Sequence, residues 1–504
     1  MAPLEGRCQR KLTEGCILTE TPLRPAYGGP PPLQGRLTGG ILMKTLIYGG
    51  HLIDPANGID GRYDLLLENG RVAWVGTGRP PADRTIDAAG RIVTPGFIDI
   101  HIHEDPVKNG SIQQCIFPMM LRQGVTTAVG GNCGGNVHDP LDYLNMVDRD
   151  GAAVNVALYA GHEYFRIAAG AADIYGGSTE QQRQEMAKNI TAALEGGCVG
   201  VSFGLRYVPG ADREEFFRAA ACCAASQKPI AAHVRDDADA VFASIEELAD
   251  AGRAFGIPMQ ISHIGSMAGF GQMEAVLKQV EGYQAEGLDV TLDCYPYFAF
   301  STRLGTPTYD PGWLQRYHCD YGVLEFCDGP YRGRRATKQT FDEMRRTFPD
   351  CLTVCYVMKE EEVRLAFRHP GVMLGSDGIT DNGRGHPRCA GTFPRFIAEF
   401  VKKGDLSLYR AIEKMTAMPA KRLNLKKKGH LGVGADADVT IFNYDAIRDR
   451  ATFVQPDLPP EGIEYVLLGG EVVLEQGKIL NATRGRALRI GREGVGMHHI
   501  KASP

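Results

Sequence analysis

The stretch Thr94-Pro95-Gly96-Phe97-Ile98-Asp99-Ile100-His101-Ile102-His103 decides how the rest of this chain is interpreted. It begins as an apolar strand and ends in two histidines at positions i and i+2. Alternate side chains of a strand face the same way, so both imidazoles point together off its carboxyl end. Two nitrogen ligands can thus reach one metal ion, although a lone His-x-His pair also occurs at ordinary strand ends.

Seven further apolar runs follow this strand, and helical stretches such as 238–254 and 273–285 separate them. The predicted strands are 125–129, 154–158, 199–203, 229–233, 259–263, 290–294 and 372–377. Strands that alternate with helices favour a parallel sheet, and eight such strands indicate a closed (β/α)8 barrel of the TIM type. The pattern predicts this barrel over residues 95–424, with an insertion around 305–368 where charge-rich stretches interrupt the rhythm.

The two ends of the chain have a different, strand-rich character. Residues 44–94 contain short apolar runs around Asn69-Gly70, a dipeptide typical of hairpin turns. The runs 437–442 and 465–473 are also rich in strand-forming residues, with glycine at the turns. Neither set is large enough to bury a core alone. We therefore expect an α/β protein in which 44–94 and 425–490 combine into one small β-sandwich domain. Residues 1–42, rich in Pro, Gly and Arg, are interpreted as a non-native or disordered extension before Met43.

The composition is typical of a soluble globular protein: 504 residues, 43% hydrophobic, 23% charged, with a net charge of −5. There is no basic excess for nucleic acid, and no run approaches the roughly 20 apolar residues of a membrane span. Thirteen scattered cysteines without a CxxC pair favour reduced thiols and a cytoplasmic location. We expect a small-molecule partner, and the sequence leaves a homo-oligomer open.

Residues of metal-ligand type follow the predicted strands at the ends where barrel enzymes place their sites. They are His101, His103, Cys133, His233, His263 and Asp377. His233 and His263 occupy equivalent places in successive units (263 − 233 = 30). Ligands that converge in this way indicate a metal site, and zinc accepts thiolate and imidazole together.

The chemistry of such a site follows from the ligand types. Zinc with an open position lowers the pKa of water to about 7 and polarises a carbonyl. Asp377 is placed to act as general base and then as general acid. Two alternatives stay open: Asp377 in Ser376-Asp377-Gly378 as a helix N-cap, and Cys133 as a nucleophile, although zinc would quench its thiolate.

The motif Pro-Gly-Phe-Ile-Asp-x-His-x-His with distant histidines and a late Ser-Asp-Gly resembles the amidohydrolase superfamily. Further motifs are similar to those of the N-acyl-D-amino-acid deacylases, over residues 44–490. These motifs are Gly131-Asn132-Cys133-Gly134, Ile261-Ser262-His263, Asp293-Cys294-Tyr295-Pro296-Tyr297 and His386-Pro387-Arg388. The resemblance implies hydrolysis of a linear amide, most simply an N-acyl-D-amino acid. It also implies one tight zinc on Cys133, His233 and His263, and a second, weaker site lined by His101, His103 and Asp377.

On the substrate side, the resemblance implies that Tyr207, Tyr295 and Ser301 lie near the substrate carboxylate. One position departs from the family, which commonly has a lysine where this chain has Gly265. A cation that would pair with an amino-acid carboxylate is therefore missing there. Candidate replacements are Arg206, Arg303 and Arg388.

Two rival functions are weighed against this one. A cyclic-amide hydrolase of the hydantoinase or dihydroorotase type would need a bridging lysine at a strand end, and the strand 199–203 has none. A non-catalytic binding protein with a degenerate site would not need the complete ligand set or Asp377.

Overall fold

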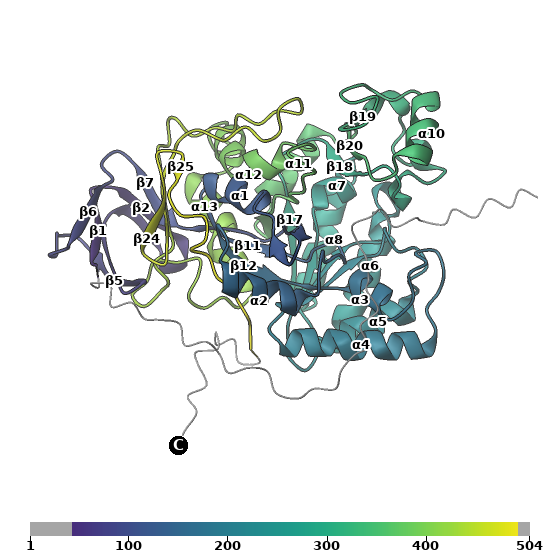
Figure 1. The fold of residues 1–504 in the computed structure, drawn as a ribbon, viewed down its shortest axis with the longest axis horizontal. Helices are drawn as coiled ribbons and strands as arrows, with labels where there is room; N and C mark the ends of the chain where they lie inside the picture. The colour runs from purple at the N-terminus through teal and green to yellow at the C-terminus, as the bar shows by residue number, and fades with distance from the viewer. Residues whose placement is uncertain (1–42, 492–504) are drawn as a thin grey trace, which may run out of the picture. The chain divides into compact units, whose positions relative to one another are not determined.

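The computed structural model describes residues 43–491, so the interpretation of residues 1–42 lies outside the described part of the chain. Its centre is a set of parallel strands with helices packed around them (Figure 1). The strands are β8 (Phe97–Asp99), β11 (Val125–Gly130), β12 (Asn155–Leu158), β13 (Ala160–Gly161), β14 (Val201–Gly204), β15 (Ile230–His233), β16 (Met259–Ile261), β17 (Val290–Cys294) and β21 (Val372–Leu374). Every predicted strand is present.

Backbone hydrogen bonds close these strands into a barrel. Their orders are β12-β11-β8 and β13-β14-β15-β16-β17-β21, and only Tyr159 separates β12 from β13. On the opposite side, Ile102 pairs with Gly378 in parallel. The N–H of Asp377 donates to the carbonyl of His101 at 2.7 Å, and that of His103 donates to Gly378 at 2.9 Å. The predicted (β/α)8 barrel is confirmed.

Amphipathic helices cover the barrel. In α6 (Val241–Phe255) the buried positions include Val241, Ile245, Leu248 and Ala249, the spacing of one helix face, and Gly256 ends the helix at φ 63°. The others are α1 (Ile116–Arg122), α2 (Pro140–Asp150), α3 (His162–Ala168), α4 (Glu180–Glu195), α5 (Arg213–Ala221), α7 (Ile264–Ala268), α8 (Met273–Ala285), α11 (Glu360–Arg368), α12 (Arg388–Phe396), α13 (Leu408–Met415) and α14 (Ala417–Arg422). No helix within residues 43–491 combines the length and apolar character that crossing a membrane requires.

Strands from both chain ends form two further sheets. One has the order β5-β4-β1-β6, made of β1 (Thr45–Tyr48), β4 (Asp64–Glu68), β5 (Arg71–Gly76) and β6 (Arg84–Asp87). The other has the order β25-β24-β23-β22-β7-β2-β3, made of β2 (His51–Asp54), β3 (Ile59–Arg62), β7 (Ile92–Pro95), β22 (Val439–Phe442), β23 (Ile463–Leu468), β24 (Glu471–Glu475) and β25 (Lys478–Ile479).

These two sheets share one core. β22 pairs antiparallel with β7, which sets Ile441 opposite Val93, and Figure 1 shows the yellow C-terminal strands beside the purple N-terminal ones. Ile47 and Leu65 of the first sheet pack in one apolar cluster with Val93 and Ile441 of the second. The chain then passes directly from β7 through Gly96 into β8. The motif that opened the sequence analysis is therefore the link from the β-sandwich into the barrel.

A small antiparallel sheet separates β17 from the last barrel unit. It has the order β18-β20-β19, made of β18 (Phe300–Arg303), β19 (Leu324–Phe326) and β20 (Leu352–Cys355), and it carries α9 (Trp313–Arg316) and α10 (Lys338–Thr347). This sheet begins before the predicted start at 305. The predicted end at 368 falls on α11, which buries Val363, Ala366 and Phe367 against the barrel. The charges that suggested an insertion there, at 360–362, are the acidic first turn of a barrel helix.

Candidate metal centre

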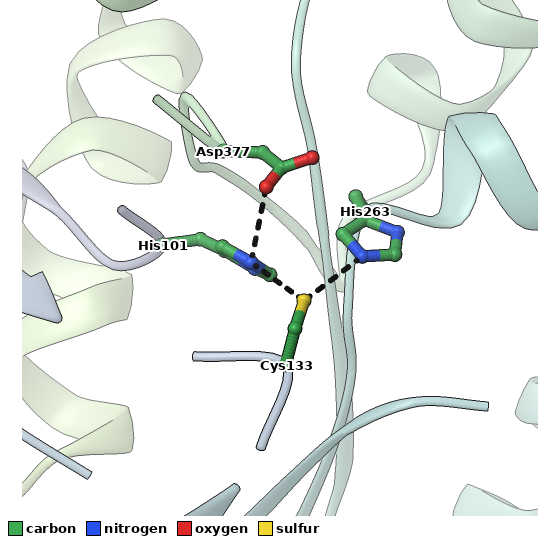
Figure 2. A group of neighbouring side chains, drawn as sticks. All are labelled: His101, Cys133, His263 and Asp377. Carbon is green, nitrogen blue, oxygen red and sulfur yellow. Dashed lines mark hydrogen bonds and ion pairs between the residues drawn. The ribbon is translucent and has the colours of Figure 1, made fainter. Parts of the chain in front are cut away.

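Four of the predicted ligands meet in one buried cluster: His101, Cys133, His263 and Asp377 (Figure 2). The Sγ atom of Cys133 lies 3.4 Å from Nε2 of His101 and 3.3 Å from Nε2 of His263. Nε2 of His101 lies 3.5 Å from Oδ1 of Asp377. Tetrahedral zinc, with bonds of about 2.0–2.3 Å, separates its ligand atoms by about 3.5 Å. The distances and the mixed thiolate, imidazole and carboxylate donors therefore fit a zinc ion.

Three of these four residues have left-handed backbone, with φ of 52° at Cys133, 34° at His263 and 50° at Asp377. Such a conformation costs about 1–3 kcal/mol at a residue with a side chain and concentrates at functional sites. Each residue follows directly after its strand or strand-end loop. The turn aims the side chain across the barrel mouth, where a continued strand would have pointed it elsewhere.

Two hydrogen bonds to the side chain of Glu104 hold the loop that carries Cys133. Oε2 of this glutamate accepts from the N–H of Gly131 at 2.6 Å, and its Oε1 accepts from the N–H of Val137 at 3.1 Å. Gly134 allows the loop to approach β14, because a Cβ there would lie 2.7 Å from the backbone nitrogen of Gly204. The thiol is thus placed by a carboxylate and a close backbone contact.

A second carboxylate, Asp293 on β17, orients two of the histidines. It lies 3.1 Å from Nδ1 of His101, and it accepts from the N–H of His263 at 2.8 Å and from Nε2 of Gln260 at 2.6 Å. Nδ1 of His263 contacts Oγ of Ser266 at 2.9 Å. Both histidines therefore turn Nε2 toward the cluster, as metal-binding histidines do when a partner holds the other nitrogen. The sequence analysis quoted Asp293 only as part of a family motif, because it sought ligands at the ends of the predicted strands and Asp293 lies inside the strand 290–294.

The other two predicted ligands border the cluster. Nε2 of His103 lies 3.1 Å from Oδ1 of Asp377. The ring of His233 packs 4.6 Å from that of His263 and 4.6 Å from that of Tyr207. His233 is buried, and its Nδ1 has no hydrogen-bond partner among the described residues. The side chains predicted to bind metal thus lie together, with four in the cluster and two beside it.

The local charges set the protonation of the ligands. Burial opposes ionisation of Cys133, but the neighbouring His263 and His101 hold its pKa well below the usual range. Burial also opposes ionisation of Asp377, but the Arg388 guanidinium and His263 keep its pKa well below normal. Burial lowers the pKa of His233 to about 4. These three groups are therefore in the protonation states in which they bind metal.

A small cavity that opens to solvent adjoins the cluster. Tyr207 and Ser301, two of the four predicted substrate residues, line it together with His233, His263 and Asp377. The other two lie next to this wall. Nη1 of Arg388 is 2.9 Å from Oδ2 of Asp377, and its guanidinium lies 4.7 Å from the ring centroid of Tyr295.

The structure shows where two sets of alternatives from the sequence lie. Asp377 makes its contacts inside the cluster, and the next helix, α12, begins only at Arg388. Of the three candidate cations, Arg388 pairs with Asp377, whereas Arg206 pairs with Asp236 and Arg303 donates to the carbonyl of Asp350.

Comparisons with known proteins agree with this geometry. Residues 349–474 match the model of the amidohydrolase family. The chain is 35% identical over 465 residues to an N-acyl-D-glutamate deacylase of Alcaligenes xylosoxydans xylosoxydans, which covers 86% of this chain and 94% of the relative. It is 31% identical over 482 residues to a D-aminoacylase of the same organism, and this match covers 88% of this chain and 97% of the relative.

A solved structure is similar over nearly the whole described chain. It is an N-acyl-D-glutamate deacylase from Bordetella bronchiseptica, complexed with zinc and a phosphonate inhibitor that mimics the tetrahedral intermediate of the reaction. The TM-score is 0.80 at 31% identity, and the match covers 89% of this chain and all (100%) of the other.

Proposed function

The chain belongs to the N-acyl-D-amino-acid deacylases of the amidohydrolase superfamily, and from this premise we propose that it hydrolyses an N-acyl-D-amino acid to a carboxylate and a free D-amino acid with the help of zinc. The observation that carries the proposal is the buried cluster of His101, Cys133, His263 and Asp377 at the carboxyl ends of the barrel strands. Catalytic groups of such barrels lie at this face.

Two groups of residues would hold metal. Cys133, His233 and His263 would bind one zinc tightly, and His101, His103 and Asp377 would form a second, weaker site. The 3.3 Å between Sγ of Cys133 and Nε2 of His263, and the buried Nδ1 of His233 without a hydrogen-bond partner among residues 43–491, support the first group. Sγ of Cys133 also lies 3.4 Å from Nε2 of His101, as expected of a ligand shared by both sites. Zinc bound here would supply Lewis acidity, which polarises an amide carbonyl and lowers the pKa of water.

Asp377 is the proposed proton carrier. The guanidinium of Arg388 keeps its carboxylate ionised, so that it can accept a proton from the attacking water. The water oxygen bonds to the amide carbon, the carbon–nitrogen bond breaks, and Asp377 returns the proton to the leaving amine. One water is consumed, and the carboxylate is ready for the next cycle.

Three side chains would bind and orient the substrate. Oγ of Ser301 is buried without a hydrogen-bond partner among residues 43–491, and so is Nε of Arg388. Burial raises the pKa of Tyr207 well above its normal value, so its hydroxyl stays protonated and can donate. Free donors of this kind suit the carboxylate of an amino acid, and Tyr295 supports Arg388 by stacking.

The remaining proposals concern partners and location. We propose a small-molecule amide as the partner, because the net charge of −5 offers nothing to nucleic acid. We also propose a cytoplasmic location, because the thirteen cysteines show no pattern of disulfide pairing. A homo-oligomer stays an open expectation.

The cyclic-amide alternative is less supported. β14 carries Ser202 and Phe203 where a bridging lysine would be needed at the strand end. A binding protein without activity is disfavoured by the complete ligand set.

The test is a panel of N-acetyl D- and L-amino acids, with hydantoins as controls, assayed with the zinc-loaded full chain. We expect turnover of D-substrates and little or none of L-substrates or hydantoins. Zinc-loaded protein that hydrolyses no N-acyl-D-amino acid would refute the proposed function.

A further inference from the structure

Apart from His233, His263 and Asp377, the side chains that line the cavity beside the metal cluster are uncharged, with the exception of one carboxylate. Met267 and Phe300 provide apolar surface, and Ser266, Thr308 and Tyr317 provide hydroxyl groups. Within residues 43–491, no lysine or arginine side chain lines this cavity. A substrate side chain that enters it therefore meets no cation from the lining.

The one charged group in this part of the wall is a carboxylate, Asp237. It is 3% exposed, lies 2.9 Å from Nε of Arg316 and 3.4 Å from Nη2 of Arg206, and accepts from the hydroxyl of Tyr317. Nη1 of Arg206 also lies 2.6 Å from Asp236.

The two arginines that contact Asp237 are thus already paired with carboxylates, and Arg388, behind the metal side of the cavity, is paired with Asp377. A second carboxylate, brought by a substrate, would face Asp237 or would have to break these pairs. Either choice leaves a buried charge without its partner, which is strongly unfavourable.

Position 265, beside the proposed ligand His263, has no room for a long side chain. A Cβ at this position would lie 2.9 Å from Sγ of Cys294 and 3.1 Å from Cε of Met358. Met358 therefore occupies the space into which a side chain from position 265 would extend. The hydroxyl of Tyr295 lies 3.8 Å from its sulfur. The space beside position 265 is therefore filled by a neutral thioether.

We propose that this pocket selects N-acyl-D-amino acids with an uncharged side chain, such as methionine, leucine or phenylalanine, over those with an acidic one. The proposal rests on the proposed function and adds the substrate class. It separates this chain from the 35% identical relative, whose name assigns it to N-acyl-D-glutamate. Apolar surface on Met267 and Phe300 favours such side chains because contact removes both partners from water.

The experiment compares kcat/KM of the zinc-loaded full chain on N-acetyl-D-methionine, N-acetyl-D-leucine and N-acetyl-D-phenylalanine with that on N-acetyl-D-glutamate and N-acetyl-D-aspartate. We expect at least a tenfold preference for the uncharged group. An equal or greater kcat/KM on the acidic substrates would overturn the inference while leaving the deacylase function intact. If no N-acyl-D-amino acid is hydrolysed, the proposed function fails first and the inference fails with it.

A variant tests the charge argument directly. Met267→Lys introduces a cation of similar length into the wall, and we expect the acidic-to-neutral ratio of kcat/KM to rise at least tenfold. Met267→Gln is the matched control, polar but uncharged, and should not raise that ratio. Zinc content is measured in both variants, and a folded, zinc-bound Met267→Lys protein with an unchanged ratio would contradict the proposal.

If both Met267 variants fail to fold, Asp237→Asn offers a second route. It removes the carboxylate that holds Arg206 and Arg316, so we again expect a higher acidic-to-neutral ratio. Product inhibition provides an independent measurement on the unmodified protein. Free D-methionine should inhibit at least tenfold more strongly than free D-glutamate, and the reverse order would count against the inference.

Discussion

The two sides of the active-site cavity are built in different ways. The metal side consists of barrel strand ends and the loops that follow them, and Asp293 on β17 contacts two of its proposed ligands, His101 and His263. The substrate side is supplied largely by the inserted sheet, through Phe300, Thr308 and Tyr317. The positions of the proposed metal ligands thus depend on the repeating barrel strands, whereas much of the substrate wall depends on a segment inserted between β17 and β21.

The largest expected effect comes from removing the thiolate at the centre of the metal side. Cys133→Ala takes away the sulfur atom that lies within 3.4 Å of Nε2 of both His101 and His263, so zinc and turnover should both be lost. Metal analysis of the purified variant checks this. Cys223→Ala, also buried but outside the cluster, is the control and should keep zinc. Full zinc occupancy in Cys133→Ala would remove this residue from the ligand set.

Asp377→Asn should separate chemistry from metal binding. The amide keeps the shape and one oxygen but cannot accept the proton from water, so we expect zinc to stay and kcat to fall by roughly 10²–10⁴-fold. Steady-state kinetics with metal analysis measures both. Turnover near that of the unmodified protein would exclude Asp377 as the proton carrier and would leave the metal side with only a binding role.

Asp293→Asn tests whether the metal side depends on its supporting layer. The variant weakens the contact to Nδ1 of His101 at 3.1 Å, and loss of such partners typically lowers metal affinity by about 10–100-fold. Zinc affinity by competition with a chelator measures the effect. Asp289→Asn, at the exposed start of the same segment, serves as the control. Unchanged affinity in Asp293→Asn would mean that the strand ends alone orient the ligands.

The metal side should also respond to pH. Burial works against a proton on His103, but its hydrogen bond to Asp377 outweighs this and raises the pKa of His103 to about 9. Below this pH the imidazole is protonated, and metal binding must displace the proton. Affinity at the second site should therefore fall by up to about tenfold per pH unit as pH drops below about 9. Calorimetry in buffers of different ionisation enthalpy would detect the released proton; an affinity independent of pH between 6 and 9 would contradict it.

The same division explains what could be predicted from sequence. Apolar runs that end in His101, His233 and His263 place the barrel strands and the candidate ligands within short segments, so local pattern was sufficient to predict the barrel and to propose those ligands. The left-handed backbone at Cys133 and Asp377, and the contact of Asp293 with His101, arise only when distant strands meet. The substrate wall was least predictable, because the network of Asp237, Arg206 and Arg316 joins the barrel to the insertion.

The smallest expected effect comes from removing a helix N-cap, once in the insertion and once on the barrel. α10 in the insertion begins with a capping box in which the N–H of Thr340 donates to Oγ1 of Thr337 at 3.3 Å. α4 on the barrel has the same device, with the N–H of Gln182 at 3.3 Å from Oγ1 of Thr179. Each Thr→Ala change should cost about 1 kcal/mol of stability, measurable as a lower midpoint of denaturant unfolding.

Only the change in the insertion should reach the substrate. The ring centroid of Phe341 in α10 lies 6.2 Å from that of Tyr309. The ring centroid of Tyr309 lies 6.4 Å from that of Phe300 in the cavity wall. Loosening α10 by about 1 kcal/mol should therefore raise KM by up to about fivefold without loss of zinc. Thr179→Ala should leave both KM and zinc unchanged. A higher KM in both variants, or in neither, would mean that the insertion and the barrel do not act as separate parts in binding the substrate.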